Sequence, residues 1–251
     1  MSRLADIPIP VELISQARAG DEAAQAGIYR ALAPALFSLV RRLVGNKVVA
    51  EDLFQDTMLA MFQRLGFIPD QQDALEDALA SMKKLQEKTR PDIQAVNNPA
   101  KRYAGQLMGR WVTIMGSGLL TTVARRWKGQ MNEIAKAGAN FEFLPEADHN
   151  TLAGTMNPEE VLNPHTMTLF LRAPSDHPRN RLRSDLTRKA FMLEGMNTDH
   201  VDAQGNTALA HMWTLILFGD YVAYYLSMGY GVDPTPIQAL VDFKKSMSEA
   251  K

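Results

Sequence analysis

The sequence predicts an α/β protein in which a parallel sheet flanked by helices follows an all-helical N-terminal module. Three observations lead to this fold class. The N-terminal part shows apolar residues at helical spacing throughout. Beyond it, short apolar runs rich in β-branched residues alternate with helical segments, which is the pattern of a parallel sheet covered on both faces. The chain of 251 residues is 46% hydrophobic, which is ample for a sizeable core.

Four helices are predicted for the first part of the chain. Gly20 ends the first of them, and Asp21 follows at the position where its side chain can cap the long second helix. Apolar residues recur at helical spacing in that second helix, and the fourth helix carries alternating charge on its outer face. Two prolines and paired asparagines make residues 90–101 a linker, because they do not continue a helix. The predicted helices cover residues 12–20, 21–46, 48–66 and 72–89.

Strands and helices alternate in the second part. Residues 111–115 and 166–172 are short apolar runs with β-branched residues, and residues 199–203 hold the corresponding place before the next helix. One helix is predicted directly after Gly118, and the later helices cover residues 179–193, 207–228 and 237–250. The sequence therefore predicts a helical module over residues 1–58, a helical connector over 59–97 and an α/β domain over 98–251.

Charge and composition exclude several classes of protein. Lys and Arg number 27 against 28 Asp and Glu, and a net charge of -1 provides no long-range field for a general nucleic-acid binder. Residues 1–58 hold six basic and seven acidic residues, so no direct DNA binding is expected there either. The chain has no cysteine, which excludes disulfides and thiolate nucleophiles. Without a secretion signal or a long apolar run, we expect a cytoplasmic protein that does not span a membrane.

Gly116, Ser117 and Gly118 follow the first predicted strand and open a helix. Free backbone N–H groups and the helix dipole at such a turn favour an anion, so these residues are candidates for binding a phosphate. The alternative is that a tight strand-to-helix turn simply needs glycines for packing. A mostly helical chain separates Ser117 from Glu133 by roughly 20 Å, at about 1.5 Å per residue, so one small sugar phosphate would not reach both.

Arg126, Gln130 and Glu133 form a second group of candidates. Their i, i+4, i+7 spacing places them along one stripe of a helix, where they can share a cleft or form an ordinary solvent-facing salt bridge. His149 lies in a polar turn, a position at which a histidine seldom fills a core and is incidental more often than catalytic. The other histidines show no metal-ligand spacing, and no G-x-S-x-G motif marks a nucleophilic serine. Neither a metal site nor Ser-His-Asp chemistry is therefore predicted.

A series of segments in the second part carries a family resemblance. In chain order they are RLGFIPD, NPAKRYAGQLMGR, GSGLLTTVARRWKGQMNEIAK, FLPEADHN, DHPR, LFGDYVAYYL and GVDPTP. From about Met61 to the end, they resemble the C-terminal half of the bacterial and archaeal bifunctional phosphoglucose/phosphomannose isomerases, which are built from two sugar isomerase (SIS) domains. The resemblance implies an SIS-type sheet with Glu133 as the proton-shuttling base, His149 as the residue that assists ring opening and Lys244 as a group at the sugar ring.

The implied reaction converts glucose 6-phosphate or mannose 6-phosphate to fructose 6-phosphate. One base removes a proton beside the carbonyl and returns it to the neighbouring carbon, so a carboxylate suffices and no cofactor is expected. The family's histidine reaches a neighbouring subunit's site, which implies a homodimer. The family's first SIS domain, with its phosphate-binding loop and its enediolate-stabilising arginine, has no counterpart in this sequence. A complementing SIS-domain chain is therefore the other partner that the resemblance implies.

The N-terminal module resembles a different family. ARAGDEAAQAGIYRALAPALFSLVRRLVGN and AEDLFQDTMLAMFQRL, within roughly residues 10–60, are similar to region 2 of extracytoplasmic-function sigma factors. That resemblance implies a helical module that docks on RNA polymerase, but the promoter-melting part does not follow. Three hypotheses remain open. The chain is an incomplete phosphosugar isomerase, a sugar-phosphate-sensing or polymerase-associated regulator without catalysis, or an SIS domain that only dimerises or pairs with a separate first domain.

Overall fold

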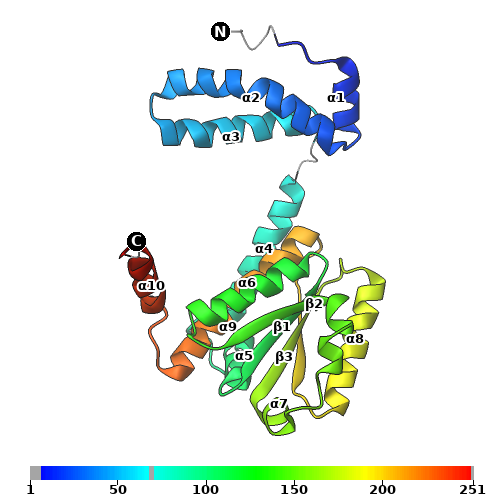
Figure 1. The fold of residues 1–251 in the computed structure, drawn as a ribbon, viewed down its shortest axis with the longest axis vertical. Coiled ribbons are helices and arrows are strands. Elements are labelled where there is room, and N and C mark those ends of the chain that lie inside the picture. The colour runs from blue at the N-terminus through cyan, green and yellow to red at the C-terminus, as the bar shows by residue number, and fades with distance from the viewer. Residues whose placement is uncertain (1–6, 68–70, 250–251) are drawn as a thin grey trace. The chain divides into compact units, whose positions relative to one another are not determined.

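A computed structural model describes residues 7–67 and 71–249 of the chain. It divides into two compact units, residues 1–72 and residues 73–251. The helices of the first unit are α1 (Val11–Arg18), α2 (Glu22–Val44) and α3 (Lys47–Arg64) (Figure 1). The helices predicted for this part of the chain are therefore confirmed.

Capping side chains and a small apolar core explain this helical unit. Asp21 accepts a hydrogen bond from the backbone N–H of Ala24 at 2.9 Å and so caps α2, as predicted. Asn46 caps α3 in the same way by accepting from the backbone N–H of Val48 at 2.9 Å. The side chains that pack α2 against α3 are Leu36, Val40, Ala50, Phe54 and Met58. The unit therefore has a core of its own.

Within the described residues, α2 is the helix long and apolar enough to cross a membrane, judged by length and composition alone. No membrane-spanning segment was expected from the sequence, so α2 was not identified there as a candidate. The same helix carries Arg30, Arg41 and Arg42, and it buries Ile28 against α1. A helix with three arginines and a packed face is equally typical of the core of a globular unit.

The second unit contains a four-stranded parallel sheet in the order β2-β1-β3-β4. Its strands are β1 (Trp111–Ser117), β2 (Ala139–Leu144), β3 (Thr166–Arg172) and β4 (Thr198–Asp202). The predicted parallel sheet is confirmed, with strands at the three predicted places. The strand that the prediction lacks is β2, whose sequence ANFEFL alternates polar and apolar residues at the edge of the sheet. It has no continuous apolar run of the kind that marks β1 and β3.

Helices cover both faces of the sheet (Figure 1). The helices from residue 72 onward are α4 (Gln72–Thr89), α5 (Pro99–Leu107), α6 (Leu120–Glu133), α7 (Glu159–His165), α8 (Pro178–Leu193), α9 (Ala208–Tyr230) and α10 (Gln238–Glu249). Of these, α10 lies apart from the sheet. Ile114 of β1 and Leu169 of β3 share a core with α5, α6 and α9. The next residue of each strand, Met115 and Phe170, packs instead with Phe191 of α8. This alternation is the period of two of strands that are buried on both sides.

The predicted linker over residues 90–101 holds for residues 90–98, which lie in no helix or strand, and is corrected at its end, where residues 99–101 begin α5. Asn98 accepts a hydrogen bond from the backbone N–H of Lys101 at 3.1 Å, and Pro99 occupies the first turn of the helix. Asn98 also donates its side-chain amide to the carbonyl oxygen of Arg90 at 3.1 Å. The sequence Asn98-Pro99 is therefore a helix start, in which the asparagine caps the helix and the proline needs no hydrogen-bond partner for its nitrogen.

Tyr103 of α5 lies against β4, which is the other edge strand of the sheet. Its hydroxyl donates to the carbonyl oxygen of His200 at 2.7 Å. Burial, followed by the charge of Asp199, raises the pKa of Tyr103 to about 12. An unfolded chain ionises its tyrosines near pH ~10. Above that pH the unfolded state loses a proton that the folded state keeps.

We therefore expect the free energy of unfolding to fall as the pH rises from about 10 to about 12, because the unfolded state binds fewer protons in this window. Tyr103→Phe removes the ionisable group. Its free energy of unfolding should be about 1 kcal/mol lower than that of the wild type at neutral pH, because the hydrogen bond is missing. Above pH ~10 its free energy of unfolding should fall less steeply than that of the wild type. Urea unfolding of both proteins across this pH window measures the difference. Parallel declines of the two proteins would contradict the assignment to Tyr103.

Candidate functional site

Glu133 ends α6, the helix that follows β1. Its side chain is exposed and lines a cavity of about 590 Å³ between the end of α6 and the segment that leads into α10. The other lining residues are Lys128, Gly129, Asn132, Lys136 and residues 236–240. A carboxylate in the wall of a cavity of this size is positioned to contact a small ligand, which is the first requirement for a proton-transferring base.

Two lysines share this cavity with Glu133. Lys136 has a positive φ of 53°, and its Nζ donates to the carbonyl oxygen of Glu133 at 2.6 Å and to that of Pro234 at 3.2 Å. Lys128 lies one turn before Asn132 on the same wall. Two cations beside one carboxylate favour an anionic ligand. Within residues 7–67 and 71–249, no group of three or more His, Cys, Asp or Glu side chains is arranged to hold a metal ion.

Arg126 and Gln130 meet a third residue, Asp220 of α9. Arg126 donates to the side-chain oxygen of Gln130, and Gln130 donates its amide to Asp220. The Arg126 guanidinium lies 4.0 Å from the same carboxylate. Burial between α6 and α9 raises the pKa of Asp220, against the opposing effects of Gln130 and Arg126. The three residues predicted to share one face of the helix therefore have different surroundings. Arg126 and Gln130 interact with Asp220 of α9, whereas Glu133 lines the cavity.

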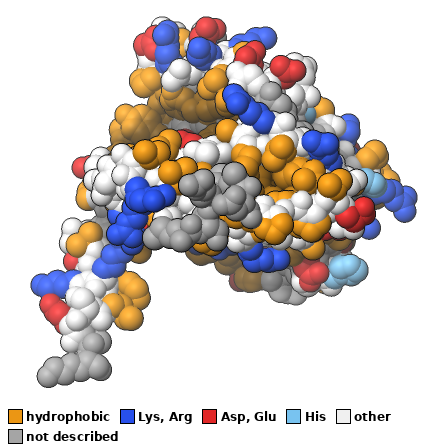
Figure 2. Space-filling view, turned by 90° about the horizontal axis from the view of Figure 1, so that it is seen from above, with side chains coloured by type: hydrophobic (Ala, Val, Ile, Leu, Met, Phe, Trp, Pro, Cys, Tyr) orange, Lys and Arg blue, Asp and Glu red, His pale blue; other side chains and the backbone are white. Residues whose placement is uncertain are grey.

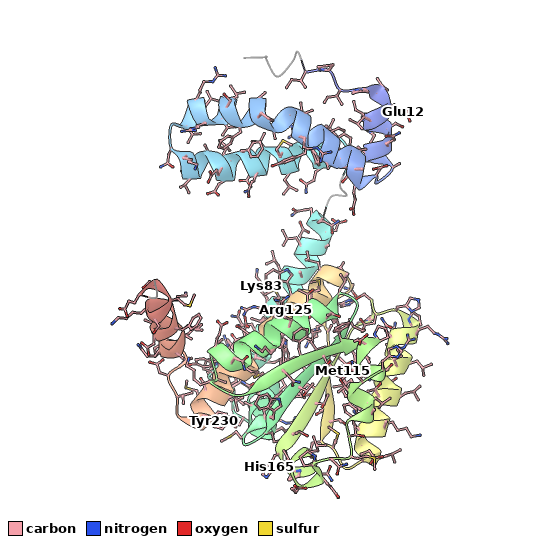
Figure 3. The ribbon with its side chains drawn as sticks, viewed as in Figure 1. Glu12, Lys83, Met115, Arg125, His165 and Tyr230 are labelled. Atoms are coloured by element: carbon pink, nitrogen blue, oxygen red, sulfur yellow. The ribbon has the colours of Figure 1, made fainter. Side chains whose placement is uncertain are left out.

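His149 and Lys244 lie outside the cavity that Glu133 lines. His149 follows a 3₁₀ turn (Glu146–Asp148) after β2, where it is exposed and its backbone N–H donates to Glu146 at 2.9 Å. Lys244 belongs to α10, every residue of which is exposed. Figure 3 shows α10 standing apart from the sheet layers, and Figure 2 shows it projecting with apolar and basic side chains along its length. Within one chain, the three predicted catalytic residues are therefore not gathered at one place.

Gly116, Ser117 and Gly118 lie at the other end of α6 from Glu133, about 20 Å away along the helix. Ser117 is buried, with 5% of its surface exposed. A Cβ on Gly116 would lie 2.3 Å from the carbonyl oxygen of Leu120, so this glycine lets α6 start close against β1. Gly118 takes a left-handed φ of 52° that glycine favours. These observations support the packing alternative, and anion binding at this turn stays a prediction.

The residues that the sequence prediction missed are Lys128, Lys136 and Asp220. Lys128, Asn132 and Lys136 recur every four residues, which is a helical spacing that was available in the sequence. Asp220 is ninety positions from Gln130, so their pairing depends on how α6 packs on α9. Spacing within the chain carries no signal for it.

Two family models match the chain. The model described as "Bacterial phospho-glucose isomerase C-terminal SIS domain" matches residues 96–247. The model described as "Sigma-70 region 2" matches residues 28–87, a range that ends within α4. The first range lies within the isomerase resemblance from about Met61 onward, and the second overlaps the sigma resemblance over roughly residues 10–60 and extends beyond it.

Two curated relatives are bifunctional phosphoglucose/phosphomannose isomerases. A bifunctional phosphoglucose/phosphomannose isomerase of Caldicellulosiruptor bescii is 33% identical over 195 residues, covering 77% of this chain and 57% of the relative. One of Aquifex aeolicus is 30% identical over 185 residues, covering 74% and 55%. The chain thus spans little more than half the length of these curated relatives.

Two solved structures share the fold of the second unit. A glucose-6-phosphate isomerase like protein of Thermus thermophilus superposes with a TM-score of 0.58 at 23% identity, covering 67% of this chain and 56% of that one. The tagatose-6-phosphate ketose/aldose isomerase of Escherichia coli has a TM-score of 0.51 at 14% identity, covering 74% and 54%. At these identities the likeness shows the fold alone.

Proposed function

The chain belongs to the bacterial phospho-glucose isomerase C-terminal SIS domain family, and we propose that it carries the proton-transfer part of a phosphosugar aldose–ketose isomerase site. The reaction is the conversion of glucose 6-phosphate or mannose 6-phosphate to fructose 6-phosphate, in the cytoplasm. The single observation that supports it best is Glu133, an exposed carboxylate in the wall of a cavity that also holds Lys128 and Lys136.

Each of these side chains has a role that its chemistry suits. The Glu133 carboxylate removes the proton from the carbon beside the sugar carbonyl and returns it to the neighbouring carbon. The enediolate formed between these steps is anionic, and the ammonium groups of Lys128 and Lys136 stabilise it electrostatically. His149 donates the proton that opens the pyranose ring. Lys244 acts at the sugar ring once α10, the helix that bears it, moves over the substrate.

The site is completed by a second polypeptide. The chain covers 57% of the length of the Caldicellulosiruptor bescii relative. A second copy of this chain or a separate SIS-domain chain supplies the missing phosphate-binding groups and brings an imidazole to Glu133. For the chain alone we expect weak turnover, because the phosphate would not contribute the remote binding energy that holds the sugar at the base.

Hydrogen exchange tests the base at low activity. In D₂O, an isomerase that shuttles a proton incorporates deuterium at C1 or C2 of the sugar phosphate, and each catalytic event is counted by NMR or mass spectrometry. Glu133→Gln removes the basic oxygen while keeping the size of the side chain, so we expect incorporation to fall by about 100-fold or more.

Glu87→Gln is the matched control, since Glu87 is an exposed residue of α4 outside this cavity. It should exchange like the wild type. Exchange that survives Glu133→Gln would reject this carboxylate as the base. No exchange in the wild type, together with a thermal shift on adding fructose 6-phosphate, would instead favour a sensor without catalysis.

A second candidate function is a polymerase-associated regulator. Its support is the match of residues 28–87 to Sigma-70 region 2, together with exposed apolar side chains at the turn between α2 and α3, where Leu43 is 76% and Val48 is 65% exposed. Immobilised full-length chain should then retain RNA polymerase subunits, whereas a chain lacking residues 1–72 should not. Equal retention, or none, would count against this candidate.

A further inference from the structure

Ser175 and His211 form a pair that the isomerase chemistry does not use. Ser175 is an exposed residue of the loop between β3 and α8, at the carboxyl edge of the sheet where α/β proteins bind their ligands. His211 lies in the first turn of α9 and is 2% exposed. The Ser175 Oγ and the His211 Nδ1 are 2.8 Å apart, which is hydrogen-bond distance.

The second ring nitrogen decides the direction of that hydrogen bond. His211 Nε2 lies 3.1 Å from the carbonyl oxygen of Gly205, and a carbonyl only accepts. The ring proton is therefore on Nε2. In the neutral imidazole, Nδ1 then presents its lone pair to the Ser175 hydroxyl, which donates to it. This is the order of a nucleophile, a base and a group that orients the base.

The orienting carbonyl is itself held in place. Gly205 has a φ of 98°, and a Cβ there would lie 2.9 Å from Ser81 Oγ, so the loop is closely packed against α4. Asp77 of α4 accepts hydrogen bonds from the backbone N–H groups of Asn206 and Thr207, each at 2.8 Å. These bonds lower the pKa of Asp77, which keeps it an ionised acceptor. The imidazole is thus fixed from a second element and needs no side-chain carboxylate to orient it.

A cavity of about 330 Å³ adjoins the Ser175 loop and includes Pro174 and Arg181 in its wall. Arg181 donates to the carbonyl oxygen of Pro174 at 2.9 Å, which places a cation beside the serine. Arg172, in the same wall, is already paired with Asp202 at 2.8 and 3.1 Å. Asp185 lies in this wall as well and is also paired with Arg172, at 3.5 Å. The volume suits a small ester, and Arg181 can donate hydrogen bonds to its oxygen atoms.

We propose that Ser175 is an activated nucleophile that accepts the acyl group of a small ester, with His211 as its base. The Ser175 Oγ forms a bond to the ester carbonyl carbon while its proton moves to His211 Nδ1. The bond between that carbon and the leaving alcohol oxygen then breaks, and the alcohol takes the proton from Nδ1. The products are an acyl-Ser175 and a free alcohol, and no other reactant is needed. Glu133 takes no part, because it lines a different cavity.

The test uses the full chain and p-nitrophenyl acetate. Release of p-nitrophenolate should show a burst of about one equivalent per chain, the fingerprint of covalent catalysis. Peptide mass spectrometry should find the acetyl group on Ser175. Ser175→Ala should abolish both signals, and His211→Gln should slow the burst by about 100-fold or more.

Ser246→Ala is the control, since Ser246 is an exposed serine of α10 and should leave the burst unchanged. Ser175→Ala also removes the hydrogen-bond partner of the buried His211 Nδ1, so thermal unfolding is used to verify that this variant is folded. Acetylation confined to lysines, a burst that persists in Ser175→Ala, or the same burst rate in folded His211→Gln would each overturn the proposal. In those cases the pair serves only to satisfy a buried histidine.

Discussion

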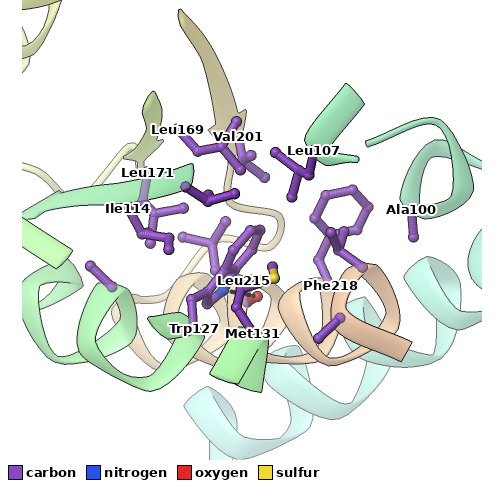
Figure 4. Packing of buried hydrophobic residues seen from close by; sticks show 14 of the residues in the cluster. Ala100, Leu107, Ile114, Trp127, Met131, Leu169, Leu171, Val201, Leu215 and Phe218 are labelled. Atoms are coloured by element: carbon purple, nitrogen blue, oxygen red, sulfur yellow. Dashed lines mark hydrogen bonds between the residues drawn. The ribbon is translucent and has the colours of Figure 1, made fainter. Parts of the chain in front are cut away.

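Trp127→Ala is expected to lower the free energy of unfolding of the second unit by about 4 kcal/mol. Trp127 is fully buried at the centre of the core that joins the sheet to α6 and α9 (Figure 4). Its indole N–H donates to the carbonyl oxygen of Leu215 at 2.8 Å. The substitution therefore opens a large cavity and also removes this buried hydrogen bond, and both effects destabilise the folded state.

Tryptophan fluorescence during urea unfolding measures this loss, because the chain's three tryptophans, Trp111, Trp127 and Trp213, all belong to the second unit. Trp213→Ala is the matched control. Trp213 is 44% exposed on α9, so its truncation should cost no more than about 1 kcal/mol. Similar losses for the two variants would contradict the central place given to Trp127.

Gly116→Ala is expected to destabilise the same unit by about 3 kcal/mol. The added Cβ would lie 2.3 Å from the carbonyl oxygen and 2.6 Å from the carbonyl carbon of Leu120. These are backbone atoms in the first turn of α6, so no flexible side chain can move aside. The helix start must shift away from β1, and the packing of α6 on the sheet loosens with it.

Gly105→Ala is the control for this second experiment. Gly105 lies inside α5, has no atom within 4 Å of the added Cβ, and should be unaffected or stabilised by about 0.5–1 kcal/mol. Urea unfolding of both variants gives the comparison. A well-tolerated alanine at 116 would refute the packing explanation of this glycine and return the turn to the anion-binding interpretation.

The fold was predictable where one strand or helix carries its own pattern. β1 and β3 are buried on both faces, so their apolar runs stand out in the sequence. β2 lies at the edge, is only partly buried and has polar residues between its apolar ones, which removes that signal. Asn98-Pro99 was ambiguous because the same two residues favour both loops and helix starts. The hydrogen bond from the backbone N–H of Lys101 to the Asn98 side chain identifies a helix start.

The candidate site was predictable only in part, for a related reason. Glu133 was identified by resemblance, and its exposure in a cavity agrees with a chemical role. Asp220 and Gln130 meet through the packing of α6 on α9, and Ser175 meets His211 through the packing of the β3–α8 loop on α9. The members of each pair are far apart in the sequence, so neither the helical period nor the spacing of a motif predicts that they meet. Ser175 also lacks the G-x-S-x-G context by which a nucleophilic serine is usually sought.

The hydroxyl of Tyr103 has a consequence for how this protein behaves at high concentration. An edge strand with open carbonyl groups is a template on which other chains add strands, and repeated addition leads to fibrils. By occupying the His200 carbonyl, Tyr103 of α5 takes away one of the acceptors that such addition at β4 would need. Strand addition at β4 would therefore have to break the hydrogen bond between Tyr103 and His200 or do without that acceptor.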